Sequence, residues 1–226
     1  MFLQQDNWCS KEFQSIKLGD KRLNRRFLMV ANHLLNNPAE PIHVACNTWS
    51  EAKAAYRLFD NEKLKEETIL QKHQVETVKR LEKVNGFIFA IQDTTTLNYT
   101  HHPKKKGINK INHTPGFKQP SKGCFLHNTL LITENGLPLG LIDQKLFQHD
   151  PAQTIDHKRR PITEKQSFKW IESLRTTTTL CQRKQVVTIS DRESDIFEFF
   201  GMVQKRPKMG ITWQLGTCPL LSWVFT

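Results

Sequence analysis

Residues 87–96, with the sequence FIFAIQDTTT, and residues 186–191, with the sequence VVTISD, decide the fold class of this chain. Each contains a short, continuous apolar run that leads into an aspartate, and such runs are typical of strands inside a sheet. Between them lie segments that predict a hairpin and then a helix. A helix that crosses a sheet normally returns to a parallel strand, so it can bring Ile189 beside Ile91. We therefore predict an α/β fold for this part of the chain.

The segment between the two runs carries a clear hairpin signal. Residues 124–133 are rich in β-formers, and residues 137–147 can make the returning strand. They are joined through Asn135-Gly136, and Asn-Gly is the strongest short hairpin sequence. The spacing of apolar residues then predicts a helix over 163–175 and another over 193–200. The expected order is strand, hairpin, helix, strand and helix.

The first part of the chain, residues 1–82, has a helical pattern instead. Apolar residues at helical spacing predict three helices, over residues 20–35, 48–59 and 66–81. Asp20 can cap the first helix, and Thr48 or Ser50 can cap the second. In the second helix we expect a buried apolar stripe formed by Trp49, Ala52, Ala55, Tyr56 and Phe59. The sequence thus predicts a small helical domain before the sheet.

Basic side chains are expected on the outside of these helices, at Arg22, Arg25, Arg26, Lys53 and Arg57. Several short helices with exposed arginines are typical of a small DNA-binding bundle. An ordinary helical domain explains the same pattern equally well.

The whole chain is basic. It has 226 residues, of which 38% are hydrophobic, and its 33 Lys and Arg against 22 Asp and Glu give a net charge of +11. Such an excess often indicates a polyanionic partner, because Lys and Arg neutralise phosphates. No run of about 18 apolar residues exists, so we expect no membrane-spanning helix. Its five cysteines form no CxxC pair, which favours reduced thiols in the cytoplasm.

The steepest charge excess lies between His101 and Lys122. Six lysines occur there without any acid, at positions Lys104, Lys105, Lys106, Lys110, Lys118 and Lys122. The same segment contains three histidines, His101, His102 and His113. A solvated loop is the simple interpretation, but such a loop does not need to exclude every carboxylate.

Asp93 and Asp191 are the candidate site residues, because each follows one of the two apolar runs. Ligands of open α/β sheets bind outside the carboxyl ends of the strands. If the strands are neighbours, the two carboxylates lie at one edge and repel each other unless a cation lies between them. Mg²⁺ prefers carboxylate and phosphate oxygens, and two such ions can support phosphoryl transfer. For either residue alone, a cap or turn role is the simpler interpretation.

Other motifs are weak or absent. Cys124 and His127 have metal-like spacing without a second half, and they lie in an expected strand, so a zinc site is disfavoured. The chain contains no P-loop, dinucleotide-binding or nucleophile-elbow motif.

Four segments also carry a family resemblance. They are LGDKRLNRRF at 18–27, SEAKAAYRLFDN at 50–61, IQDTTTLNY at 91–99 and ISDRESDIFEFF at 189–200. Over about residues 8–200 the chain resembles the bacterial cut-and-paste transposases of the insertion-sequence-four family, in the transposon-five branch. The last two motifs, in this order and at this spacing, are the most specific.

The resemblance implies two functional parts. Residues 1–82 would be a helical domain that binds double-stranded transposon-end DNA, and residues 83–200 an RNase H-like core, a mixed sheet with flanking helices. Two Asp and one Glu would hold two Mg²⁺ or Mn²⁺ ions, and the two Asp fall on Asp93 and Asp191. Arg57 falls on a residue that helps to bind end DNA. The other basic residues implied in DNA binding are Arg22, Arg25, Arg26, Lys104, Lys105, Lys106 and Lys110. The expected location is the cytoplasm, on the nucleoid.

One departure from the family concerns the catalytic glutamate. In the family it lies in a late Tyr–Arg–Glu–Lys type signature, which this sequence lacks. Residues 201–226 contain no acid and show no clear helix or strand period, so the next strand of the core is not predicted. We interpret this tail as the product of a frameshift or premature stop, and the core as incomplete; a genuine alternative C-terminus is the less favoured interpretation.

Three functional hypotheses follow. In the first, the chain is a truncated transposase with little cleavage activity of its own. In the second, it is a DNA-binding module that inhibits transposition and has full-length transposase as a partner. In the third, it is a decayed product that folds poorly.

Overall fold

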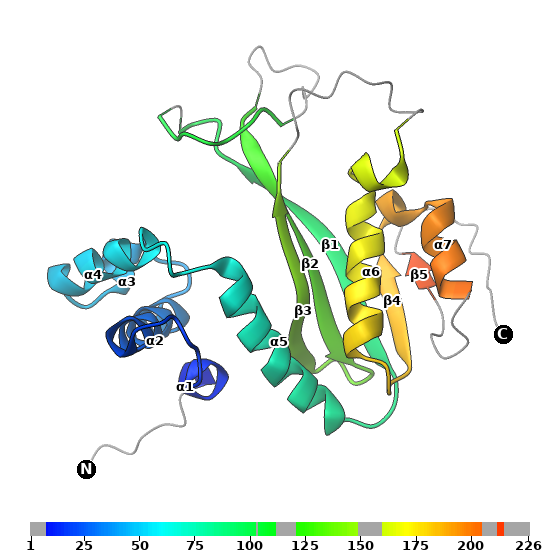
Figure 1. Ribbon diagram of the computed structural model, residues 1–226, viewed down its shortest axis with the longest axis horizontal. Helices are drawn as coiled ribbons and strands as arrows, with labels where there is room; N and C mark the ends of the chain where they lie inside the picture. Colours follow the sequence, from blue (N-terminus) through cyan, green and yellow to red (C-terminus); the bar gives the residue numbers. More distant parts are fainter. Residues whose placement is uncertain (1–7, 103, 112–120, 149–159, 205–211, 215–226) are drawn as a thin grey trace. The chain divides into compact units, whose positions relative to one another are not determined.

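The computed structural model describes residues 8–102, 104–111, 121–148, 160–204 and 212–214 (Figure 1). The chain divides into two compact units, residues 1–76 and residues 77–226. No helix in the described ranges is long and apolar enough to cross a membrane. Helices come first and a mixed sheet with flanking helices follows, so the predicted α/β class is confirmed.

The first unit is built from short helices. They are α1 (Trp8–Phe13), α2 (Lys21–Asn36), α3 (Ile42–Ala45), α4 (Trp49–Phe59) and most of α5 (Glu66–Glu82). Their apolar faces share one core, whose buried members are Cys9, Phe13, Ile16, Leu18, Leu23, Phe27, Val30, Cys46, Ala52, Ala55 and Leu58. The three longer helices confirm the three predicted from the apolar spacing.

Two N-terminal caps fix where α2 and α4 begin. The Asp20 carboxylate accepts a hydrogen bond from the Arg22 amide at 2.7 Å. At α4, the Thr48 hydroxyl accepts from the Glu51 amide at 3.3 Å, and the Glu51 carboxylate accepts from the Thr48 amide at 3.1 Å. This reciprocal arrangement is a capping box, which satisfies amides that the first helical turn leaves unpaired. Of the two caps considered for α4, Thr48 is the one that forms.

The second unit contains a five-stranded sheet in the order β3-β2-β1-β4-β5. The strands are β1 (Ile88–Asn98), β2 (Gly123–Thr133), β3 (Pro138–Phe147), β4 (Val186–Ser190) and β5 (Thr212–Gln214). The first three form an antiparallel meander, whereas β4 is parallel to β1 and β5 is parallel to β4. Ile91 pairs with Ile189. The neighbouring position expected for the two apolar runs is therefore confirmed.

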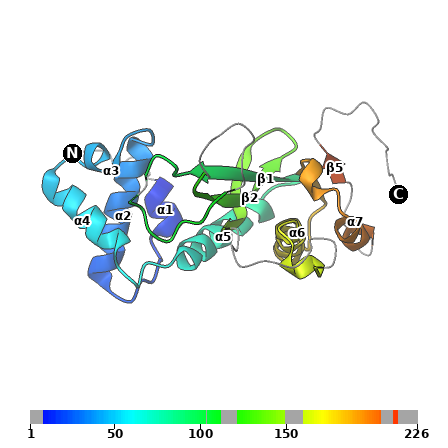
Figure 2. The same cartoon turned by 90° about the horizontal axis from the view of Figure 1, so that it is seen from above.

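Helix α6 (Phe168–Leu180) makes the crossover from β3 to β4. Helix α6 and the last turns of α5 lie on the same face of the sheet (Figures 1 and 2). Their contact with the strands buries Leu81, Ile88, Ala90, Leu131, Leu139, Ile142, Cys181 and Val186. Helix α7 (Phe197–Gln204) packs on α6 through Phe199, which contacts the core around Trp170.

The start and end of α6 differ from the prediction. We expected a helix over 163–175, but Ile162–Glu164 is a short 3-10 turn and the helix runs from Phe168 to Leu180. Four consecutive threonines, residues 176–179, lie inside it although β-branched residues lower helix propensity. Each hydroxyl donates to the carbonyl four residues earlier, as Thr177 does to Ser173 at 2.8 Å. These bonds satisfy the hydroxyls within the helix.

The segment after β4 also differs from the prediction. We expected a helix over 193–200, but a 3-10 turn at Arg192–Ser194 comes first and α7 begins at Phe197. The strand β5, which the sequence pattern did not predict, pairs Trp213 with Ile189 of β4. A strand of three residues is too short to show a period of its own. Of the tail considered in the sequence, residues 201–226, the segments 205–211 and 215–226 lie outside the described residues.

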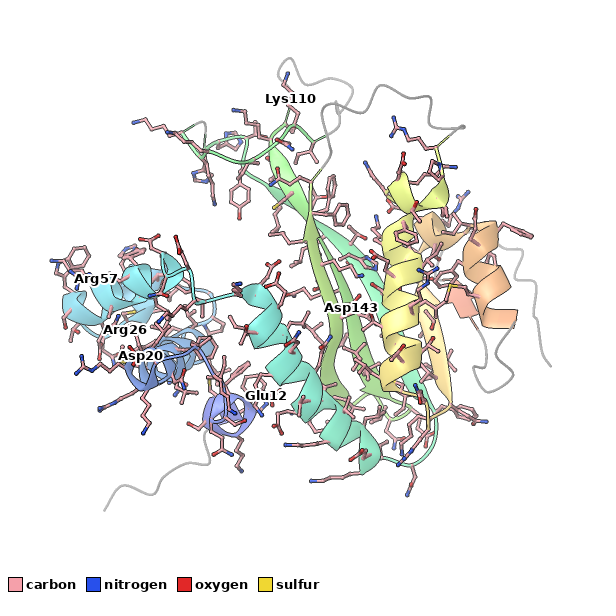
Figure 3. The ribbon with its side chains drawn as sticks, viewed as in Figure 1. Glu12, Asp20, Arg26, Arg57, Lys110 and Asp143 are labelled. Atoms are coloured by element: carbon pink, nitrogen blue, oxygen red, sulfur yellow. The ribbon has the colours of Figure 1, made fainter. Side chains whose placement is uncertain are left out.

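A polar layer lies between the sheet and α6. Gln92, Thr129 and Asp143 occupy one row across β1, β2 and β3, and all three are buried. The Asp143 carboxylate, labelled in Figure 3, accepts a hydrogen bond from the Ser173 hydroxyl of α6 at 2.6 Å. In the next row, the Thr94 hydroxyl lies 2.9 Å from Nδ1 of His127. This row contains the residue that follows Asp93, so the layer holds the middle of β1 against α6.

His127 is fully buried in this layer, with its ring centroid 4.5 Å from that of Trp170. Burial, together with the positive charges of Lys169 and Lys145, lowers the pKa of His127 to about 3. The imidazole therefore stays neutral in the folded chain at physiological pH. The cysteines of the described ranges are buried as well, namely Cys9, Cys46, Cys124 and Cys181. Burial raises the pKa of the Cys181 thiol to about 12.

The buried imidazole predicts a stability that falls on acidification. In the unfolded chain His127 takes up a proton near its ordinary pKa of 6.5, whereas the folded chain does not until about pH 3. The free energy of unfolding should therefore fall as the pH drops below about 6.5, by at most roughly 1.4 kcal/mol per pH unit from this residue. Urea unfolding at pH 7.5, 6.5 and 5.5 measures this slope.

The variant His127→Gln is the control, since it keeps a polar side chain that does not titrate. Its stability should depend less steeply on pH than that of the parent chain, so the difference between the two should shrink on acidification. A constant difference from pH 7.5 to 5.5 would contradict the assignment.

Candidate nucleic-acid interface

The first unit presents unpaired basic side chains on α2 and α4. Arg22 and Arg25 of α2 and Arg57 of α4 are exposed, and Arg26 is half-buried. None of them forms an ion pair with an acid of the described residues. Figure 3 labels Arg26 and Arg57, whose side chains project from α2 and α4. The predicted basic residues of this region thus lie where a polyanion can reach them.

The face of α2 that carries these arginines differs from its core face. Arg25 and Arg26 lie three and four positions after Arg22, which places the three on one side of the helix. The buried residues Leu23, Phe27 and Val30 lie roughly a third of a turn round the helix and contribute to the core, with the half-buried Arg26 at the border. Packing therefore fixes the direction in which the arginines point.

The lysine-rich segment of the second unit forms an arm that continues from β1 and β2. The Tyr99 amide donates to the Lys122 carbonyl at 2.7 Å, and the Ile111 amide donates to the Ser121 carbonyl at 2.7 Å. Lys110, labelled in Figure 3, is paired with Lys122 by an isolated bridge. His113 and Lys118 lie outside the described residues. Over its described part, the arm is an ordered extension of the meander.

The tip of this arm encloses an open hollow of about 460 Å³ lined by His101, His102, Lys104 and Lys105. The Lys105 ammonium lies 3.8 Å from the centroid of the Tyr99 ring. Lys106 and Lys110 are exposed on the same arm. The structure thus gathers the predicted lysines in one segment, where they can contact phosphates.

Asp191 directly follows the end of β4, as expected. Asp93 instead lies inside β1, opposite Asn128 of β2, so the expectation that a strand ends there was wrong. The strand continues because β2 pairs with it as far as Asn98.

Each of the two aspartates is two residues beyond the registered pair Ile91–Ile189, and residues two apart on a strand point to the same face. Neighbouring strands are about 4.8 Å apart, so the register brings the two aspartates near each other at the point where β4 ends. Asp93 is exposed and makes no hydrogen bond or ion pair with a described residue. The neighbouring strands that this pair requires are present, while the catalytic and metal-binding roles remain predictions.

Asp191 also has the capping role that was the alternative interpretation. Its Oδ1 accepts a hydrogen bond from the Glu193 amide at 2.8 Å, which begins the 3-10 turn at Arg192–Ser194. A carboxylate has a second oxygen, so this cap and a cation ligand are compatible. The Glu193 carboxylate is 3.1 Å from the Lys169 ammonium and is therefore engaged elsewhere. Within the described ranges, no three His, Cys, Asp or Glu side chains come together as a metal site.

Three aromatic residues of α4 are exposed although we expected them to be buried. Trp49 is 65%, Tyr56 43% and Phe59 47% exposed, and all three belong to the predicted stripe. The buried stripe is instead Ala52, Ala55 and Leu58. The sequence did contain a sign of this arrangement, because Ala52, Ala55 and Leu58 are spaced by three positions and two of them are small enough for close helix packing. The expectation was wrong because small residues let α4 approach the core and leave the large rings outside.

The comparison with known proteins agrees with the placement of basic residues in the first unit. A family model described as transposase DNA-binding matches residues 5–64. This segment contains α2 and α4 with all four predicted arginines. No curated protein matches the chain. The N-terminal part of the chain is therefore similar to DNA-binding regions of transposases, which supports DNA as its partner.

The exposed arginines predict how binding depends on salt. Each side chain that contacts a phosphate releases a counterion, so its loss should lower the slope of log K against log salt by about 1. We expect Arg22→Gln, Arg25→Gln and Arg26→Gln to weaken binding to all duplex sequences alike. Fluorescence anisotropy from 50 to 250 mM salt measures both effects.

The variant Arg183→Gln is the matched control, because it removes an exposed arginine outside the matched segment. Its salt slope should equal that of the parent chain. Equal slopes for all four variants would show that the arginines of α2 do not contact DNA.

Proposed function

We propose that the chain is a DNA-binding protein of the insertion-sequence-four type, in which the first unit binds the ends of its own mobile element. The supporting observation is the set of unpaired arginines on α2 and α4 within the segment that matches a transposase DNA-binding family. The resemblance over residues 8–200 adds the kind of element. The lysine-rich arm would provide a second set of phosphate contacts from the other unit.

The second unit would be an RNase H-like core of the DDE type. Support comes from its sheet, with an antiparallel meander followed by a helical crossover to a parallel strand. Asp93, on β1, and Asp191, directly after β4, offer the carboxylate oxygens that Mg²⁺ and Mn²⁺ prefer, so they fit part of such a site. A divalent ion bound there would polarise a phosphodiester for attack. Asp93 and Asp191 would be the residues that hold it.

We expect the chain to cleave little DNA by itself. Two carboxylates supply fewer ligands than a site for two metal ions uses, and Glu193 is engaged with Lys169. The substantive activity in this proposal is recognition of DNA, with metal binding by the acid pair as a weaker property. A transposase relative with a third carboxylate near this pair would have the complete set.

Selection from a pool of random duplexes tests the binding function without knowledge of the element ends. We expect the purified protein to enrich one sequence, and we expect that sequence to occur at both borders of the element that encodes it. Enrichment should disappear when Arg25 and Arg57 are both replaced by glutamine. A pool that stays random after repeated rounds would refute the proposal.

Binding of Mn²⁺, followed by electron paramagnetic resonance, tests the acid pair separately. We expect Asp93→Asn and Asp191→Asn each to weaken Mn²⁺ binding about tenfold or more, because each removes a charged ligand. Asp195→Asn is the control, since Asp195 is an exposed aspartate four residues after Asp191. The same weak binding in all four proteins would exclude a metal site at this pair. Mg²⁺-dependent cleavage of end DNA that Asp93→Asn abolishes would contradict our expectation of low activity.

The second candidate function is inhibition of transposition by occupation of the ends. The observation that favours it is that the matched segment falls entirely within the first compact unit. Co-expression should then lower the excision frequency of an element served by a full-length transposase. Replacement of Arg25 and Arg57 by glutamine should restore that frequency, and an unchanged frequency in the parent experiment would reject this function.

A further inference from the structure

We propose that the outer face of α4 enters the major groove of duplex DNA and that Trp49 reads thymine methyl groups there. We call this face the α4 ridge and define it as Trp49, Lys53 and Tyr56. The inference rests on the proposed function, because it specifies how the first unit recognises DNA. It assigns sequence reading to α4 and phosphate contacts to α2.

The ridge is one continuous stripe of a helix. Its residues are spaced by four and three positions, which places them on one side at 3.6 residues per turn. The opposite side is buried, with Ala55 at 0% and Leu58 at 1% exposure. Helix α4 therefore already has its core contacts, and the ridge faces away from them.

The exposure of the ridge is unusual for its residue types. Trp49 is 65% exposed and Tyr56 is 43% exposed, so two large rings lie in solvent within two turns of one helix. Single exposed apolar residues are normal, whereas exposed aromatic residues gathered on one face indicate a binding surface. The ridge thus has the character of a contact face.

The charge of the ridge selects the partner. The Lys53 ammonium lies 5.3 Å from the centroid of the Trp49 ring, so a cation and an aromatic face are presented together. Arg57 adjoins the ridge and is exposed. The acid inside α4, Glu51, is engaged by the Thr48 amide in the capping box. An apolar and positive face is complementary to DNA, which combines apolar methyl groups with negative phosphates.

The position of Trp49 on α4 suits a groove contact. The major groove is about 12 Å wide and admits one α-helix, whose N-terminal residues contact base edges. Trp49 is the first residue of α4, and its ring stands at that N-terminal end. Apolar side chains contact the thymine methyl, and lysine can donate to guanine. The ridge therefore carries the two kinds of side chain that distinguish base pairs in this groove.

Removal of single methyl groups from DNA tests this contact directly. The probe is the duplex enriched by the full chain, with each thymine replaced in turn by uracil, which lacks the methyl group. We expect one or two of these replacements to weaken binding of the parent protein by about threefold to tenfold. The same replacements should have no further effect on Trp49→Ala, because its contact is already lost.

The Trp49→Ala variant should bind the selected duplex about tenfold more weakly, with an unchanged salt slope. Phe59→Ala is the matched control, because Phe59 is an exposed aromatic residue of α4, 47% exposed, roughly a quarter-turn away from the ridge. Its affinity should equal that of the parent. A second variant, Trp49→Phe, keeps an apolar ring and should retain most of the sensitivity to uracil, provided that thermal melting shows all variants folded.

Three results would overturn the inference. One is unchanged affinity of Trp49→Ala, which would assign the ridge to a protein partner instead. Another is an equal response of parent and Trp49→Ala to every uracil replacement. The third is a reduced salt slope in Trp49→Ala, which would indicate that the site contacts phosphates. Failure of the parent chain to enrich any duplex would overturn the proposed function itself, so the two failures are distinguishable.

Discussion

The parallel pairing of β1 with β4 is the constraint on which the second unit depends. Because Ile91 pairs with Ile189, Asp93 and Asp191 are brought near each other although 98 positions separate them in the sequence. This pairing needs a crossover, and α6 supplies it while covering the face that carries Ala90. The same helix donates the Ser173 hydroxyl to Asp143 and so joins the polar layer to the meander. One pairing thus organises both the core and the candidate acidic pair.

Acidic and basic side chains gather in different parts of the chain, and each group attracts ions of the opposite sign. Carboxylates that lie near each other on neighbouring strands repel each other and attract cations, whereas the arm that follows β1 and the helices of the first unit attract anions. Both signs are thus present in one chain. Our proposed function uses both, because it pairs recognition of DNA phosphates with a cation held by the two aspartates.

Much of the fold could be predicted from the sequence because its signals are local. The caps at Asp20 and Thr48, the turn at Asn135-Gly136 and the two apolar runs each determine their own neighbourhood. The threonines of α6 could not be placed in a helix by propensity, because their stability there comes from bonds to earlier carbonyls. β5 was missed because three residues hold no period. For α6 and β5, the contacts that determine the structure are not visible in the spacing of apolar residues along the sequence.

For the candidate site, the sequence predicted which strands are neighbours but not how far they run or how α4 packs. The nearness of Asp93 and Asp191 follows from the pairing of the two apolar runs, whereas β1 continues past Asp93 because β2 pairs with it. The exposed arginines of α2 follow from helical spacing. The side of α4 that meets the core does not follow, because size alone suggested burial of Trp49. The close approach of Ala52 and Ala55 to neighbouring helices reverses that assignment. His127 likewise gave no signal, since its neutrality arises from surroundings contributed by distant segments.

The buried thiols make this chain well suited to site-specific labelling. Cys9, Cys46, Cys124 and Cys181 are buried, and burial raises the pKa of the Cys9 and Cys46 thiols as well as that of Cys181. Maleimides and similar reagents attack the thiolate, so buried thiols of high pKa react slowly at neutral pH. After replacement of Cys218, which lies outside the described residues, a cysteine introduced at exposed Val44 would be the fastest to react. A fluorophore placed there could report on the first unit without disturbance of either core.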